Sequence, residues 1–187
     1  SSDWQIEDCM LKCDLATLDN AVDNQIADHL LSGKPLPINY KTSITQSQVV
    51  TGFNFSVNVS RAVTRLSSIF MSFGGPNTDA RSKPWNNFFH PMAPGSYDPA
   101  LEVEYQVQIG SKLFPEYPVQ SLAESFAQLK KAVKDAGGSD YHGMSIKAPA
   151  YAKDKFVTAT QTSKLLAAGF TGLNTRSGDL MTIKAKI

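Results

Sequence analysis

The segment from residue 101 to residue 109 alternates strictly between apolar and polar side chains. Leu101, Val103, Tyr105, Val107 and Ile109 are separated by Glu102, Glu104, Gln106 and Gln108. Such alternation predicts a β-strand with one face in the core and one face toward water. A strand of this kind is typical of antiparallel sheets, because parallel sheets are usually covered on both faces. We therefore expect a mainly β protein with antiparallel strands.

Five further segments are predicted to be strands. The cleanest is residues 51–60, where Phe53, Phe55, Val57 and Val59 alternate with asparagine and serine. The others are residues 69–73, 156–160, 170–174 and 181–187. Pattern and β-propensity agree in the first of these and support the rest. Weaker alternation makes residues 4–14 and 36–40 strand candidates as well.

Two segments follow a helical period instead. In residues 17–32, an apolar stripe ends before Gly33 and Pro35, which favour termination of a helix. In residues 121–136, Leu122, Phe126, Leu129 and Val133 share one face. The second helix opens with Ser121 and Glu124, a capping box in which hydroxyl and carboxylate satisfy each other's backbone donors. The pattern predicts strands with two inserted helices.

Composition limits the possible classes of protein but indicates no activity. At 187 residues, the chain can form one substantial core, and 10 Phe with 6 Tyr suit a sandwich or barrel. The formal net charge of +1 gives no overall field toward nucleic acid or a membrane surface. No apolar run approaches the roughly 18 residues of a transmembrane helix, so we expect no membrane insertion. Because the chain begins with Ser1 and its last strand reaches Ile187, we expect a piece of a longer protein.

Residues capable of chemistry are few and scattered. The three histidines, His29, His90 and His142, show no metal-type spacing, and no nucleophile elbow or phosphate loop occurs. Cys9 and Cys13 would lie about 13 Å apart in an extended strand, too far to bridge, so free thiols are expected. We therefore expect no catalytic residues, no metal site and no cofactor, and we interpret the chain as a non-enzyme.

The stretch from residue 74 to residue 100 lacks any periodicity but is rich in aromatic side chains. A disordered linker would be poor in aromatics, so this loop is expected to pack against something. Its large side chains either join the core of the same domain or contact a neighbouring subunit. The candidate subunit-interface residues are Trp85, Phe88, Phe89 and Tyr97.

Two segments carry a resemblance to a known family. One runs from Gln106 through Gly110, Phe114 and Pro118 into the helix at residues 121–126. The other is residues 169–180, with the sequence GFTGLNTRSGDL. Together they resemble the jelly-roll region of the major capsid proteins of eukaryotic double-stranded DNA viruses and polinton-like elements. The likeness covers about the last hundred residues.

The resemblance implies a fold and a function. The fold would be an antiparallel jelly-roll β-sandwich over residues 1–187, either a single jelly roll or one half of a double jelly-roll subunit. The function would be a structural capsid protein that self-assembles into trimers or a larger shell, with other capsid proteins as further partners. Its place would be the virion, after assembly in the host cytoplasm or nucleus. A ligand- or carbohydrate-binding β-sandwich module is the alternative, and an enzyme on a β scaffold ranks last.

Overall fold

A computed structural model describes residues 5–37, 40–73, 88, 103–135, 144–152, 155–163, 171–176 and 179–187. Contacts within the chain divide it into two units, residues 1–38 and residues 39–187. The first unit contains one helix, α1 (Asn20–Leu31). The second contains β1 (Asn54–Val59), β2 (Ser68–Met71), β3 (Glu104–Ile109), β4 (Lys112–Val119), α2 (Leu122–Asp135), α3 (Ala148–Tyr151), β5 (Thr158–Gln161) and β6 (Met181–Lys186).

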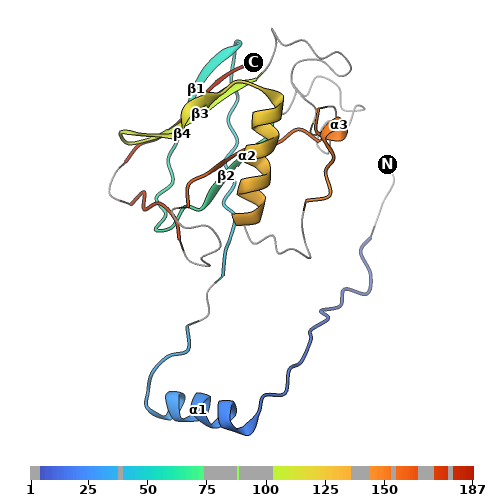
Figure 1. Cartoon of the computed structure of the whole chain (residues 1–187), viewed down its shortest axis with the longest axis vertical. Coiled ribbons are helices and arrows are strands. Elements are labelled where there is room, and N and C mark those ends of the chain that lie inside the picture. The colour runs from blue at the N-terminus through green and yellow to red at the C-terminus, as the bar shows by residue number, and fades with distance from the viewer. Residues whose placement is uncertain are drawn as a thin grey trace. The chain divides into compact units, whose positions relative to one another are not determined.

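The strands of the second unit form two antiparallel sheets (Figure 1). The larger sheet has the order β1-β6-β3-β4, so the last strand of the chain lies between β1 and β3. In its register, Phe55 and Tyr105 both lie opposite Ala185, and Val57 and Val107 both lie opposite Ile183. The smaller sheet pairs β2 with β5. The prediction of a mainly antiparallel, sheet-rich chain with a few helices is therefore confirmed, although α1 precedes all of the described strands and is not inserted between them.

The two sheets enclose a filled interior. Side chains of β2, β3, β5 and β6 surround a void of only about 10 Å³, which is room for one water molecule at most. Across this interior, the Tyr105 hydroxyl of β3 donates a hydrogen bond to the Ala159 carbonyl of β5 at 3.0 Å. This arrangement is compatible with a β-sandwich, and it leaves the polar faces of the strands outside.

Helix α2 closes the core at the side of β5. Leu129 and Ala132 are buried, and Leu122, Phe126 and Val133 pack against the same cluster, as the helical period predicts. Half of the predicted capping box is present at the start of this helix, because the carboxylate accepts from the amide before Ser121 and not from that of Ser121 itself. The Glu124 amide donates to Ser121 Oγ at 3.1 Å, and Glu124 Oε2 accepts from the Gln120 amide at 3.4 Å. The predicted helix is thus confirmed over Leu122–Asp135, and residue 136 lies outside the described residues.

One strand, β4, was not predicted from the sequence. Residues 110–118 carry two prolines and show no alternation, yet β4 pairs with β3 at both of its ends, over Lys112–Phe114 and at Val119. The register shifts between Tyr105 and Val107, so several β4 residues face Gln106 alone. Gln106 Nε2 donates to the carbonyls of Pro115 and Glu116, both at 3.1 Å. The Gln106 side chain thereby satisfies two backbone carbonyls of β4 at the point where the register shift interrupts the ladder.

The first unit differs from the sequence predictions in two places. Residues 5–14 contain no strand, and the described part of 36–40 contains none either, so those two predictions are wrong there. The helix predicted at 17–32 exists but begins at Asn20, with Asp19 as its N-cap. The physical reason is that no residue of α1 is buried and none of residues 5–19 is covered, so no sheet partner stabilises extended pairing.

The segment predicted as a strand at residues 170–174 is a single bridge in its described part. Leu173 and Leu66 exchange backbone hydrogen bonds of 2.9 Å in each direction. Next to this bridge, buried Thr175 accepts a hydrogen bond from the Val63 amide through Oγ1 at 2.9 Å and donates its own amide to the Val63 carbonyl. The segment therefore holds the connection between β1 and β2 in place.

Candidate interaction surface

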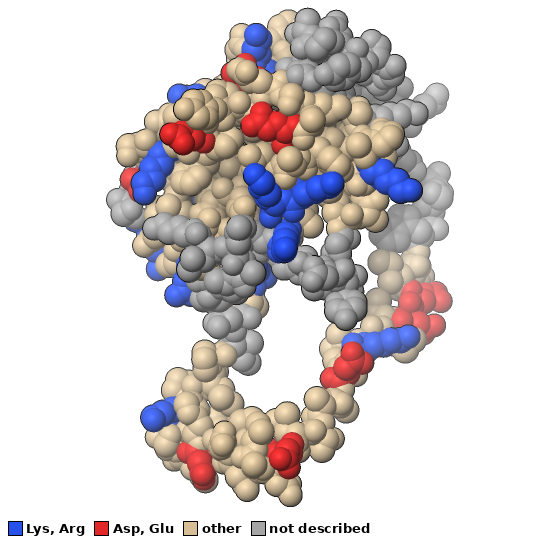
Figure 2. All heavy atoms as spheres, viewed as in Figure 1, with Lys and Arg blue, Asp and Glu red and all other residues tan. Residues whose placement is uncertain are grey.

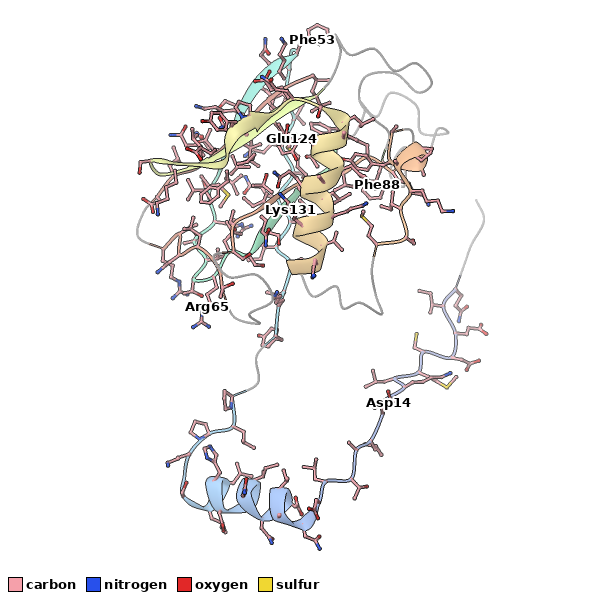
Figure 3. The ribbon with its side chains drawn as sticks, viewed as in Figure 1. Asp14, Phe53, Arg65, Phe88, Glu124 and Lys131 are labelled. Carbon is pink, nitrogen blue, oxygen red and sulfur yellow. The ribbon has the colours of Figure 1, made fainter. Side chains whose placement is uncertain are left out.

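The structure describes only one of the four candidate interface residues. Trp85, Phe89 and Tyr97 lie outside the described residues. Phe88 is described, and its carbonyl accepts a 2.7 Å hydrogen bond from the Phe156 amide. Its side chain is 46% exposed (Figure 3). The backbone of Phe88 is therefore bonded within its own unit, while about half of its side chain is accessible to solvent. Its role at an interface stays a prediction.

The outer face of the four-stranded sheet is polar. The register places Asn54, Lys186 and Glu104 in one row across β1, β6 and β3. The next two rows, in the same strand order, are Ser56, Lys184 and Gln106, then Asn58, Thr182 and Gln108. This face follows directly from the alternation in the three strands, whose apolar partners point into the core.

Hydrogen bonds order part of this polar face. Thr182 Oγ1 donates to Asn58 Oδ1 at 3.0 Å, and Lys184 Nζ donates to Gln108 Oε1 at 3.0 Å. Both pairs join neighbouring strands, so they fix side-chain direction as well as register. The face presents amides, hydroxyls and charges of both signs to a partner.

A shallow hollow of about 480 Å³ lies over the first two rows. Its lining comes from all four strands of the sheet: Asn54, Phe55, Ser56, Glu104, Tyr105, Gln106, Pro118, Lys184, Ala185 and Lys186. The volume is in the range of small-molecule sites, but such sites are usually concave, whereas this hollow is open. Its exposed lining is more apolar than polar, and lysine, carboxylate and amide groups are also present. A partner that has both apolar and polar groups, such as a sugar or a protein surface, fits this chemistry.

Both edges of this sheet carry an exposed aromatic side chain. Phe53, directly before β1, is 75% exposed, and Tyr117 of β4 is 76% exposed (Figure 3 labels Phe53). Among the described residues, β1 and β4 each have a strand partner on one side only. Unpaired strand edges are templates for association with another chain.

Three hydroxyl groups meet inside the core beneath α2. The Tyr151 hydroxyl donates to the Val157 carbonyl at 3.1 Å and lies 2.8 Å from Ser125 Oγ. Tyr105, whose hydroxyl binds Ala159, belongs to the same buried cluster. The sequence patterns did not predict this group, although Ser125 gives a signal, since a small polar residue interrupts the apolar face of the helix. With Tyr105 and Tyr151 both about 1% exposed, the group holds the core together and offers no reacting atom to a substrate.

Burial has a consequence for stability in alkali. Loss of solvation raises the pKa of Tyr105 from 10.0 to about 12, in spite of hydrogen bonds to Ser125 and Ala159 that lower it. Burial also raises the pKa of Tyr151. Below pH 10 both the folded and the unfolded chain keep these protons. Above pH 10 the unfolded chain ionises first and gains stability relative to the folded chain.

We therefore expect the free energy of unfolding to fall between about pH 10 and pH 12. For Tyr105 alone, two pKa units correspond to a loss of roughly 2.7 kcal/mol once the pH passes the folded-state pKa. Urea unfolding at pH 8, 10, 11 and 12 measures this loss. Tyr105→Phe should give a shallower decline over the same range, and an equally steep decline in that variant would contradict the assignment.

Comparison with known proteins assigns no family. The chain matches no family model, and searches of curated proteins and of solved structures also find no match.

Within the described residues, no group of three or more His, Cys, Asp or Glu side chains is placed to hold a metal ion. No helix of the described part is long and apolar enough to cross a membrane. His90 and His142 lie outside the described residues, and His29 Nε2 lies 3.3 Å from the Pro35 carbonyl.

Proposed function

We propose that this chain is a structural protein that self-assembles, and that its sandwich is a jelly roll of a viral capsid subunit. The observation that carries the assembly part is that β1 and β4, each with an exposed aromatic side chain at its edge, have one strand partner only among the described residues. Aromatic anchors of this kind often supply most of the energy of a protein interface. The interior is filled, so the groups available to a partner are on the outside.

The capsid part of the proposal rests on the two segments of family resemblance. In the structure these segments are neighbours: the Gly110 amide donates to the Leu180 carbonyl at 3.1 Å. Gly110 has a φ of +58° in the turn between β3 and β4, a conformation that favours glycine. A Cβ at this position would lie 2.8 Å from Asp179 Oδ1. The two segments that carry the resemblance are therefore packed against each other.

The assembly proposal is tested by removing the two edge aromatics from the full chain. In multi-angle light scattering, the wild-type chain should reach a trimer or a larger body, above its monomer mass of 20.3 kDa. The double variant Phe53→Ser, Tyr117→Ser should need at least tenfold more protein to reach the same mass. Val49→Ser is the matched control, because this exposed side chain lies outside both sheets. Unchanged association in the double variant would contradict the edge proposal.

The hollow on the polar sheet face favours a second candidate, a carbohydrate-binding module. Its lysine, carboxylate, amide and hydroxyl groups match the hydrogen-bonding capacity of sugars. Under this candidate, a fitting oligosaccharide raises the melting temperature, and Gln106→Ala with Lys184→Ala removes the effect. A melting temperature that no member of a glycan panel changes would count against it.

A further inference from the structure

The N-terminal unit exposes apolar side chains that its own residues do not cover. Among residues 5–37, nine large apolar residues are exposed: Ile6, Met10, Leu11, Leu15, Leu18, Val22, Leu30, Leu31 and Leu36. Leu15 is 96% exposed. None of the residues of α1 is buried. A concentration of exposed apolar residues in so short a stretch is typical of a segment that binds another surface.

Helix α1 has the length and pattern of a docking helix. It spans 12 residues, and helices of this length are marginal in water when they stand alone. Val22, Ile26 and Leu30 follow each other at four-residue spacing and therefore share one face. A partner that covers this face would supply the stability that the isolated helix lacks.

Charge indicates the chemistry of that partner. Residues 1–38 contain seven acidic and two basic residues, a formal net charge of −5. Residues 39–187 contain ten acidic and sixteen basic residues, a formal net charge of +6. Two N-terminal units would repel one another, whereas the larger unit of a second copy attracts them. Figure 2 shows acidic side chains on the N-terminal unit.

The second half of α2 provides a basic surface on the larger unit. Lys130, Lys131 and Lys134 are all exposed there. Figure 2 shows basic side chains gathered at this place, and Figure 3 labels Lys131 beside the helix. Lys130 Nζ lies 4.5 Å from the centre of the Phe126 ring, so an apolar surface is adjacent to the charges. The combination suits an acidic segment that also carries apolar side chains.

We propose that residues 5–37 of one copy bind the lysine-bearing face of α2 on a second copy. This inference rests on the proposed self-assembly and names the two surfaces that meet. Lysines Lys130, Lys131 and Lys134 attract the carboxylates of the N-terminal unit, and its apolar stripe becomes covered on contact. Association of this kind weakens as salt screens the charges.

Reversal of charge on either surface tests the pairing in the full chain. One variant changes Lys130, Lys131 and Lys134 to Glu, and another changes Asp14, Asp23 and Asp28 to Lys. Sedimentation equilibrium should show at least tenfold weaker self-association for each, with recovery when the two variants are mixed or combined. The control changes Lys112, Lys147 and Lys155 to Glu, which is the same charge change at exposed lysines outside α2. Association of both reversed variants at wild-type strength would overturn the proposal.

The two cysteines of the chain allow a direct check of which copy is bound. Cys9 and Cys13 are free, exposed and both in the N-terminal unit. A cysteine-to-lysine cross-linker is applied to a mixture of ¹⁵N-labelled and unlabelled chains. Links from these cysteines to Lys130, Lys131 or Lys134 that join a labelled to an unlabelled chain support the proposal. Links confined to a single chain, or directed mainly to other lysines, overturn it.

These outcomes separate this inference from the proposed function. A wild-type chain that remains a monomer at high concentration contradicts self-assembly itself. A chain that assembles but is indifferent to both charge reversals contradicts only the role of residues 5–37.

Discussion

Replacement of Tyr151 by alanine is expected to lower the free energy of unfolding by about 3–5 kcal/mol, the range for large aromatic truncations in a core. Tyr151 is 1% exposed and contacts two aromatic rings. The centre of its ring lies 4.8 Å from that of Phe126 and 5.1 Å from that of Phe156. The change leaves a cavity between α2, α3 and the strand that follows. Urea unfolding of the full chain at pH 7 measures the loss.

Tyr151→Phe separates packing from hydrogen bonding at the same position. This variant keeps the ring but removes the hydroxyl that donates to Val157 and contacts Ser125. We expect a cost of about 1–2 kcal/mol, since one hydrogen bond is lost and Ser125 Oγ loses a partner. If Tyr151→Ala costs no more than Tyr151→Phe, the ring does not contribute to the core as described.

Gly172→Ala is expected to cost about 2–3 kcal/mol, comparable with overpacking in other cores. A Cβ at residue 172 would lie 2.5 Å from the backbone carbon of Arg65 and 2.8 Å from the Leu66 nitrogen. These are backbone atoms and cannot rotate away. The methyl group therefore forces apart the bridge between Leu66 and Leu173. Thermal unfolding should show a lower melting temperature, because the connection between β1 and β2 is held less firmly.

Gly52→Ala is the comparison for this effect. It adds the same methyl group at a position with nothing within 4 Å, although the positive φ of +88° there carries a conformational cost of its own. We expect about 1 kcal/mol for that strain. A Gly172→Ala variant that is as stable as the wild-type chain would show that the bridge at Leu66 and Leu173 is not as close as described.

The strands with one buried face were predictable from sequence. Strand β3 alternates between partly buried and buried residues along its whole length, and β6 does so along most of its length. In each case the pattern arises because the sheet has one face in the core and one in water. Helix α2 was predictable for the same reason, since it buries a single stripe and carries its own cap.

The elements that sequence reasoning missed lack such a pattern. Strand β4 follows a turn at Gly110, contains Pro115 and Pro118, and changes register, so its residues do not alternate. Helix α3 spans four residues, too few to show a period. In residues 5–14, apolar residues suggested a strand, but none of them is covered, and a pattern without a partner sheet does not define a strand.

The residues of the candidate site were predictable from the sequence, but their arrangement was not. The polar residues of the sheet face were visible as the hydrophilic half of each alternation, but their rows depend on β6 lying between β1 and β3. That pairing joins residues more than a hundred positions apart, such as Asn58 and Thr182, and no local pattern contains it. The buried hydroxyls of Ser125 and Tyr151 also come together only through tertiary packing.

The mass and symmetry of the native assembly test the central claim most directly. Native mass spectrometry and electron microscopy of the full chain at high concentration should show a closed body with threefold symmetry, or a larger shell, at a multiple of 20.3 kDa. A single species of 20.3 kDa at every concentration would contradict the claim that the edges and outer surface of this sandwich serve assembly.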